Sequence, residues 1–382
     1  MNHSVKRKNT PQDVLERKKR HDAPLIKEYQ TLTALCFENR RNKKQDNKAL
    51  QVTTDLLDLN PDNYTFWNIR REIFLESIFP GLEKTQDTSD SNSVAAAAAA
   101  AAKQKLLLNE IHFVLSKMKV YPKSYWLWNH RSWCINQFPE ADWNQELGLV
   151  DYLLSKDQRN FHGWHYRRIV IDKLNTLQQY KPAADDPDKT LVQHEFRFTT
   201  LKINQDFSNF SAWYNRALLI PSYLTEKVAE EKASGEKEET LRIAFLDGEI
   251  NYVQQALFTD PDLSSAWFYH KWLYNNLQRS IVPGLSTAKC AEYLQKEIDI
   301  VEELAAEEPE NSYCLLALVY LRDHMRSNEQ QEGESKQKEE DSKRVVEVYN
   351  ELQKIDPLRR NMYADWKATY LKGAHSKAEQ AK

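Results

Sequence analysis

One short sequence pattern occurs five times in this chain, and it constrains the fold more than any other feature. The five copies are NPDNYTFWNIRR (60–71), YPKSYWLWNHRS (121–132), DQRNFHGWHYRR (157–168), DFSNFSAWYNRA (206–217) and DPDLSSAWFYHK (260–271). Their shared residues are Trp67 and Arg70, Trp128 and Arg131, Trp164 and Arg167, Trp213 and Arg216, and Trp267, which His270 follows in place of an arginine. Such a repeat predicts one supersecondary unit per copy, stacked on its neighbours.

Each copy has the features of a helix start. A Pro or Asp ends the preceding segment, and an Asn or Ser four residues before most of the tryptophans suits a helix N-cap. The aromatic residue, the tryptophan and the arginine follow at intervals of three and lie close to one helical face. Apolar runs with helical periodicity precede the motifs, such as residues 106–120 and 191–203. Each repeat is therefore predicted to be a helix, a short turn and a second helix.

The composition favours an all-α chain. Glycine accounts for only 8 of 382 residues, whereas doubly wound and β-rich folds use glycine freely in their turns. Hydrophobic residues make up 41% and charged residues 29%, which is typical of a folded chain. The net charge of −3 argues against nucleic-acid binding, because that binding needs a basic face.

The four cysteines, Cys36, Cys134, Cys290 and Cys314, are far apart in the sequence. No CxxC pair occurs, so neither a disulfide scaffold nor a self-contained zinc site is expected. No apolar run reaches the length of about 18 residues that a membrane-spanning helix needs. The polar N-terminus lacks the apolar segment of a secretory signal. We expect a reduced, cytoplasmic protein, and we interpret the basic runs near the N-terminus as solvated faces.

The intervals between tryptophans define the domain organisation. Trp128 and Trp164 are 36 residues apart, which sets the base period, and the longer intervals carry insertions. The predicted parts are a basic N-terminal segment (1–24), a helical-repeat domain (25–371), insert loops (85–102, 225–240 and 326–344) and a disordered tail (372–382). An alanine run at 95–102 either extends a helix start or stays loose. The fifth repeat departs most from the pattern, as terminal repeats commonly do.

The repeated tryptophans and arginines suggest roles in packing. Large tryptophan side chains suit the space between stacked hairpins, where they act as wedges. The arginine one turn later either bonds carbonyls of the neighbouring repeat or faces a partner. The sequence leaves both roles of the arginine open.

The five copies resemble the repeat of protein prenyltransferase α subunits, Pro-x-Asn-Tyr-x-x-Trp-x-x-Arg, over roughly residues 50–275. The string SAWFYHKWL (265–273) and the segments 303–317 and 354–360 are similar to the Rab geranylgeranyltransferase, or type II, members. The resemblance then extends to about residue 370, without the immunoglobulin-like and leucine-rich domains of animal members. A histidine near the start of those members has its counterpart in His3, one position later.

This resemblance implies a right-handed, crescent-shaped superhelix of antiparallel helix hairpins that wraps a β subunit in an obligate heterodimer. It implies that the β subunit, an α/α barrel, holds a zinc ion and most of the isoprenoid pocket, and that this chain holds no metal or cofactor. The implied reaction transfers geranylgeranyl groups from geranylgeranyl diphosphate to C-terminal cysteines of Rab GTPases. An escort protein presents the Rab to the enzyme.

The resemblance also indicates which residues approach the substrate. Family members have a Pro-Lys-x-Tyr lysine in the second repeat that projects toward the diphosphate, and this chain matches it with Lys123 and the neighbouring Tyr125. Cations near a departing pyrophosphate lower the barrier of the reaction. His162 lies at the same turn of the next repeat and is a candidate for the subunit interface near the active site. His130 and His165 are interpreted as interface residues without a role in proton transfer.

Two alternatives remain open. The first is the α subunit shared by farnesyltransferase and geranylgeranyltransferase type I, against which the 265–273 string and the additional C-terminal helices argue. The second is a helical-repeat scaffold without an enzymatic partner, which predicts a stable monomer. The β subunit that copurifies with the chain discriminates among the three. No Ser/His/Asp or paired-carboxylate spacing supports hydrolase chemistry in this chain alone.

Overall fold

The computed structural model describes residues 11–84, 92–138, 141–182, 189–232, 237–328 and 336–380. Within these ranges the regular structure is helical and contains no strand, which confirms the predicted all-α repeat fold. The chain divides into two compact units, Met1–Gln179 and Tyr180–Lys382. The right-handed, crescent-shaped superhelix stays a prediction.

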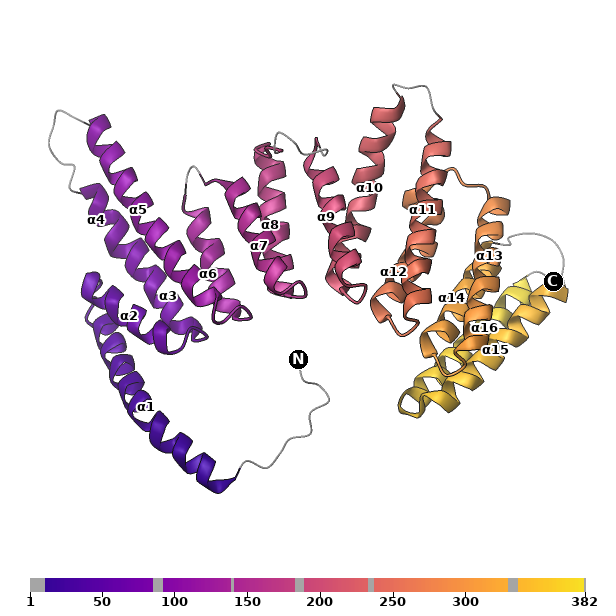
Figure 1. The fold of residues 1–382 in the computed structure, drawn as a ribbon, viewed down its shortest axis with the longest axis horizontal. Helices are drawn as coiled ribbons and strands as arrows, with labels where there is room; N and C mark the ends of the chain where they lie inside the picture. The colour runs from indigo at the N-terminus through magenta and orange to yellow at the C-terminus, as the bar shows by residue number, and fades with distance from the viewer. Residues whose placement is uncertain are drawn as a thin grey trace. The chain divides into compact units, whose positions relative to one another are not determined.

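The first unit begins with a long helix, α1 (Gln12–Arg41), which precedes three helix hairpins (Figure 1). The hairpins pair α2 (Asn47–Leu59) with α3 (Tyr64–Ile73), α5 (Asn92–Met118) with α6 (Tyr125–Asn136), and α7 (Trp143–Lys156) with α8 (Phe161–Leu177). Helix α3 continues through a π turn (Phe74–Ile78) into the short α4 (Phe79–Lys84). The wider turn accommodates Pro80, which lacks an amide hydrogen and crowds the preceding carbonyl in a regular helix.

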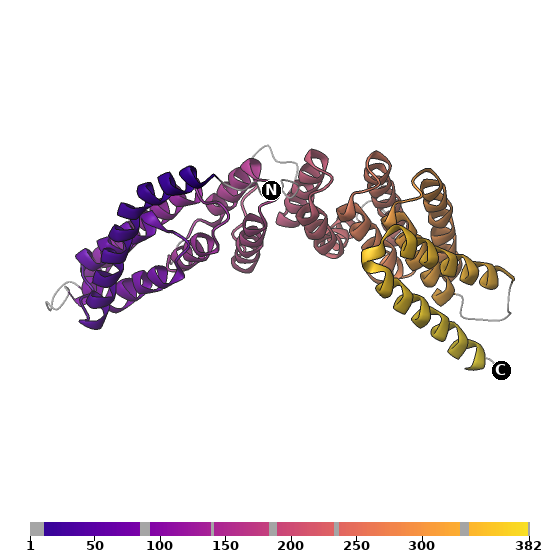
Figure 2. The same ribbon diagram turned by 90° about the horizontal axis from the view of Figure 1, so that it is seen from below.

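The second unit contains four further hairpins. They pair α9 (Leu191–Gln205) with α10 (Phe210–Lys232), α11 (Glu238–Thr259) with α12 (Ser264–Asn275), α13 (Thr287–Glu307) with α14 (Ser312–Asn328), and α15 (Lys336–Ile355) with α16 (Arg360–Gln380). A π turn (Leu277–Ile281) follows α12, and a short 3₁₀ turn (Pro357–Arg359) joins α15 to α16. Figure 2 shows α15 and α16 side by side at the C-terminal end of this unit.

The five repeated tryptophans occupy equivalent buried positions, as predicted, with relative exposures between 1% and 6%. Each indole N–H donates a hydrogen bond to the backbone carbonyl six residues earlier, at distances of 2.8 to 2.9 Å. The accepting residues are Pro61, Pro122, Gln158, Phe207 and Pro261. Each tryptophan therefore fills space in the core, and its indole N–H also stabilises the turn before its own helix.

The predicted N-caps are present in three of the four repeats that carry Asn or Ser at this position. Asn63, Asn160 and Asn209 each accept a hydrogen bond from a backbone amide two or three residues later. Ser124 makes no such bond, and its buried hydroxyl has no hydrogen-bond partner. Serine and asparagine are about equally good N-caps in general, so the missing bond is a feature of this one turn.

The fifth repeat is not the terminal one, contrary to our interpretation. Helices α13 and α14 form a further hairpin, and Asn311 accepts hydrogen bonds from the amides of Tyr313 and Cys314 at the start of α14. Leu315 is buried where the earlier repeats have tryptophan, four residues after the capping asparagine. The repeat motif is not recognisable in this hairpin because leucine, a smaller apolar residue, takes the place of the tryptophan in the core.

Several segments that we expected to be loops or tails are helical. Helix α5 covers residues 92–102 of the first insert, so the alanine run extends a helix start, which was one of its two predicted states, and α16 covers residues 372–380 of the tail. Helix α1 covers residues 12–24 of the basic N-terminal segment, for which no loop was predicted. Parts of the other two inserts belong to α10, α11, α14 and α15. Alanine, glutamate and lysine are strong helix formers, so these compositions indicate solvated helix ends rather than loops. Residues 85–91, 233–236 and 329–335 lie outside the described residues.

Candidate functional site

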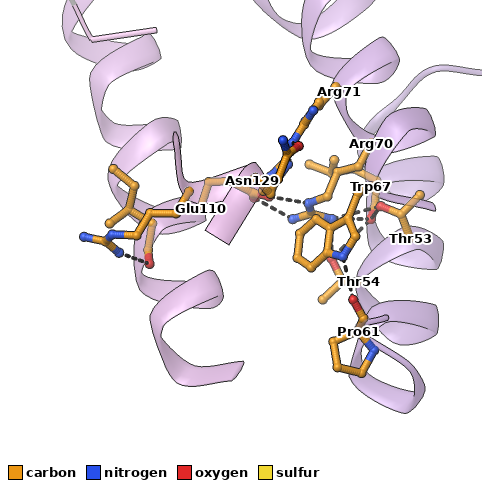
Figure 3. Close-up of polar contacts among 12 residues, drawn as sticks. Thr53, Thr54, Pro61, Trp67, Arg70, Arg71, Glu110 and Asn129 are labelled. Carbon is orange, nitrogen blue, oxygen red and sulfur yellow. Dashed lines mark hydrogen bonds and ion pairs between the residues drawn. The ribbon is translucent and has the colours of Figure 1, made fainter. Parts of the chain in front are cut away.

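The repeated arginines are buried and bind carboxylates inside the fold. Arg70 donates to both oxygens of Glu110 on α5, at 2.5 and 2.7 Å, and also to the hydroxyls of Thr53 and Thr54. Figure 3 shows Arg70 lying beside Trp67, whose indole points at the Pro61 carbonyl. Backbone carbonyls contribute less, through bonds from Arg70 to Leu50 and from Arg131 to Ile111. The open question about the arginines is thereby answered, because they tie neighbouring helices together.

The other repeats place the same kind of pair at the same position. Arg131 binds Glu146 on α7, and Arg216 binds Glu249 on α11, so each arginine reaches the first helix of the next repeat. Arg167 contacts Asp151 on the first helix of its own repeat. In the fifth repeat His270 takes the role of the arginine, with its Nε2 2.6 Å from Glu297 on α13.

His130 is not an interface residue, contrary to our interpretation. Its side chain is fully buried, where Nε2 lies 2.8 Å from Glu110 and Nδ1 accepts a hydrogen bond from Arg71 at 3.0 Å. Burial lowers the pKa of His130 to about 4, so the ring is neutral at pH 7. Burial also opposes the ionisation of Glu110, but hydrogen bonds from His130 and Arg70 outweigh it and lower its pKa to about 2. His165 is exposed.

The structure brings the three candidate substrate-facing residues together in the first unit. Lys123 lies in the turn between α5 and α6, Tyr125 begins α6, and His162 lies in the first turn of α8. The ring of Tyr125 is 4.2 Å from the ring of His162, measured between centroids. The backbone of Lys123 also lies close enough to the His162 ring to affect its pKa. The three side chains therefore form one cluster, which we call the Lys123 cluster.

Accessibility differs within the Lys123 cluster. The side chain of Lys123 is 53% exposed, and its Nζ lies 3.4 Å from Oδ2 of Asp157. Tyr125 is mostly exposed, whereas His162 is buried. Burial lowers the pKa of His162, and the nearby backbone of Lys123 opposes that shift only partly. The cluster thus presents an accessible cation and a phenol, backed by a neutral histidine.

The turn that carries Lys123 is held by neutral hydrogen bonds. The carbonyl of Pro122 accepts from Nε1 of Trp128 at 2.8 Å and from Nδ2 of Asn160 at 2.9 Å. The Oδ1 atom of Asn160 accepts from the amides of His162 and Gly163, so one asparagine joins two successive turns. Sequence reasoning identified Asn160 only as a cap and did not identify Asp157, although both lie in the quoted third copy.

In four of the five copies the residue three positions before the tryptophan is aromatic and largely exposed, whereas the predicted spacing places it close to the helical face of the buried tryptophan. In the first unit these residues are Tyr64, Tyr125 and Phe161, and each is more than half exposed. Trp126 packs against Tyr64 with ring centroids 5.1 Å apart, and Tyr125 against Phe161 at 5.8 Å. In the second unit Phe210 and Phe268 are similarly exposed and 5.9 Å apart. These first-turn aromatic residues project away from the core that holds the tryptophans.

The described residues offer neither a metal site nor a membrane-spanning helix. All four cysteines are buried and free. Across the described ranges, no group of three or more His, Cys, Asp or Glu side chains is arranged to hold a metal ion. In the same part of the chain, no helix combines the length and hydrophobicity needed to cross a membrane.

Comparison with known proteins identifies the family. The family model named protein prenyltransferase alpha subunit repeat matches residues 46–77, 107–138, 143–174, 192–223 and 246–277. The chain is 37% identical over 365 residues to the geranylgeranyl transferase type-2 subunit alpha of Schizosaccharomyces pombe, covering 94% of this chain and 96% of that protein. This chain belongs to the geranylgeranyl transferase type-2 alpha subunit family.

Other members of the geranylgeranyl transferase type-2 alpha family support the assignment. The Saccharomyces cerevisiae member is 32% identical over 368 residues, covering 94% of this chain and 97% of that protein. The Homo sapiens member is 33% identical over 264 residues, which cover 69% of this chain and 40% of that protein. The family predicted from the repeats is confirmed, and its type-2 branch is favoured over the shared α subunit.

A solved structure supports the fold assigned to this alpha subunit. The structure titled Candida albicans protein geranylgeranyltransferase-I complexed with GGPP contains a chain with a TM-score of 0.55 and 20% identity. The match covers 90% of this chain and 91% of that chain. At this identity the likeness describes the arrangement of helices alone.

Proposed function

We propose that this chain is the α subunit of a Rab geranylgeranyltransferase and works as a heterodimer with a β subunit. The observation that carries the proposal is the Lys123 cluster, an accessible cation on a rigid turn within a chain whose relatives are named type-2 alpha subunits. The β subunit supplies a zinc ion and most of the isoprenoid pocket. The complex acts in the cytoplasm on Rab GTPases that an escort protein presents.

In the proposed reaction a Rab cysteine thiolate attacks C1 of geranylgeranyl diphosphate. The new C–S bond forms as the C–O bond to the diphosphate breaks, so negative charge grows on the leaving group. The ammonium of Lys123 binds that charge, and its contact strengthens in the transition state. The phenol of Tyr125 is a second donor at the same turn. Buried His162 packs against the Tyr125 ring and needs no proton exchange for this role.

The exposed aromatic residues support the proposed heterodimer. Tyr64, Tyr125 and Phe161 repeat at the first turn of successive second helices, and Trp126 lies against Tyr64. Aromatic side chains in such rows are enriched at protein interfaces, where they bury large areas at a small entropic cost. Exposed apolar side chains that recur with the repeat indicate a surface that a partner covers. We therefore propose that the β subunit packs on this row.

The proposed function is tested by copurification followed by a prenylation assay. The tagged chain is expressed in its own cells, its partners are identified by mass spectrometry, and the purified heterodimer is assayed with a Rab–escort complex and geranylgeranyl diphosphate. A β subunit of the type II class and transfer to the Rab cysteines are expected. A β subunit of the farnesyltransferase class supports the shared α subunit, and a monomer without transferase activity supports the scaffold.

The role of Lys123 is tested in the same heterodimer. Lys123→Ala is expected to lower the single-turnover rate by about 10- to 1,000-fold, because one preorganised donor to the developing charge is lost. Lys119→Ala is the matched control, since Lys119 is an exposed lysine at the end of α5. Lys123→Arg should retain part of the rate. Equal single-turnover rates for all four proteins would remove Lys123 from the proposed mechanism.

A further inference from the structure

The ion pair between Lys123 and Asp157 bridges two successive turns of the first unit. Asp157 follows the last residue of α7 and begins the turn that leads into α8. Its Oδ2 atom lies 3.4 Å from Nζ of Lys123, and the two side chains are 31% and 53% exposed. Within the part of the chain that the structure describes, this carboxylate of the next repeat is the one salt-bridge partner of the proposed diphosphate-binding cation.

The two turns do not depend on the charge of Asp157 for their position. Asn160 already joins them through its bond to the Pro122 carbonyl, and the backbone amide of Asn160 donates to the Asp157 carbonyl at 3.1 Å. The indole of Trp128 holds the Pro122 carbonyl from the other side. These bonds involve no charged group, so they hold the two turns in place without the carboxylate of Asp157. The main effect of that carboxylate is therefore on the ammonium of Lys123.

The equivalent positions of other repeats show what a residue here normally does. Asn60, Asp206 and Asp260 also stand seven residues before their tryptophans, and their Oδ1 atoms accept an amide hydrogen bond within their own turns. Asn60 makes this bond with an uncharged amide side chain. Asparagine is therefore compatible with the turn, so Asp157→Asn removes the charge while preserving its geometry.

We propose that Asp157 is a positioning residue that holds the Lys123 ammonium between catalytic cycles and competes with the diphosphate for it. This inference rests on the proposed function. A carboxylate that stays next to the cation weakens its hold on any anion, including the pyrophosphate that must leave after transfer. The pair is solvent-exposed, so replacing the carboxylate by pyrophosphate next to Lys123, or the reverse, costs little free energy.

The test compares inhibition by inorganic pyrophosphate among the wild-type heterodimer and three single variants. Asp157→Asn is expected to lower the inhibition constant of pyrophosphate and the KM for geranylgeranyl diphosphate by about 2- to 5-fold, the size of an exposed charge pair. Asp157→Glu keeps the charge and should behave like the wild type. Asp172→Asn changes the net charge equally, but Asp172 lies eleven residues along α8 from Phe161, and it should leave both constants unchanged.

A double variant separates this inference from the proposed function. In a Lys123→Ala background, Asp157→Asn should have no further effect on pyrophosphate inhibition, because its target is absent. An unchanged inhibition constant in Asp157→Asn, or the same decrease with and without Lys123, overturns the inference. If Lys123→Ala itself retains the wild-type rate and inhibition constant, the proposed role of Lys123 fails and this inference fails with it.

Discussion

Two ion pairs in the first unit have the same kinds of charge but opposite surroundings. Arg70 and Glu110 are 6% and 3% exposed at their side chains and share two short hydrogen bonds. Lys123 and Asp157 lie at the surface and share one contact of 3.4 Å. The buried pair cannot exchange its partner without leaving a charge in the core. The exposed pair can, so only it is suited to meet an anionic substrate.

The pattern among the repeats matches this difference. A buried arginine or histidine next to a carboxylate occurs in all five repeats, as Arg70, Arg131, Arg167, Arg216 and His270. A lysine directly after the turn proline occurs only in the second repeat, at Lys123. A feature present in every repeat is required by stacking, whereas a feature confined to one repeat is free to serve the function of the molecule.

The largest expected effect is on stability, and it separates the two pairs. Arg70→Ala should lower the free energy of unfolding by about 3–5 kcal/mol, because Glu110 is left buried without its main partner. Lys123→Ala should lower it by less than about 1 kcal/mol. Denaturant unfolding of the heterodimer, followed by tryptophan fluorescence, measures both. Similar losses in the two variants would contradict the distinction between a structural and an exchangeable pair.

Acid should lower the free energy of unfolding through the buried groups His130 and Glu110. The native pKa of His130 is about 4 against 6.5, and that of Glu110 is about 2 against 4.5, so the unfolded chain binds protons more readily at both groups. Stability should therefore fall as the pH decreases from 6.5 toward 4 through His130, and further below 4.5 through Glu110. Unfolding measured from pH 7 to pH 4 tests this.

The control for the acid effect replaces only the histidine. His130→Gln should be less stable than the wild type at pH 7, yet it should lose less additional stability between pH 6.5 and 4.5. If the free energy of unfolding falls equally with pH in His130→Gln and in the wild type, groups other than His130 govern the acid response.

The smallest expected effect concerns the cap beside Lys123. Ser124→Asn should raise the free energy of unfolding by about 0.5–1 kcal/mol, because asparagine at this position of other repeats bonds the first amides of the helix. The reverse change at the equivalent cap, Asn160→Ser, should destabilise the chain by more than this, since it also loses the bond to Pro122. If Ser124→Asn destabilises the chain, the two turns are less equivalent than the structure indicates.

Short sequence motifs were sufficient to predict the helical-hairpin fold and to select the candidate site residues. The spacing of Trp67, Trp128, Trp164, Trp213 and Trp267 predicts hairpins, and each tryptophan is buried and bonded to its own turn. The residues that form the Lys123 cluster were chosen because their motifs resemble a family, and they lie together in the structure. Their chemical roles remain part of the proposal.

Partners from distant parts of the sequence were not predictable. Glu110 lies 40 residues from Arg70, and no local pattern marks it among the many glutamates of the chain. The same limitation explains why His130 was misassigned, since its burial depends on Glu110 and Arg71. Helix extents were also misjudged where charged or alanine-rich composition suggested a loop.

The sequence by itself determined the family, the helical repeat and the turn on which Lys123 stands, because each depends on residues close together in the chain. Only the tertiary structure decided which charges are buried and which stay exchangeable. Burial arises when helices from different repeats pack, and it sets both the cost of separating a pair and its access to solvent. For that reason Arg70 and Lys123, cations in two successive copies of the repeat, differ in their surroundings and in the roles that we propose for them.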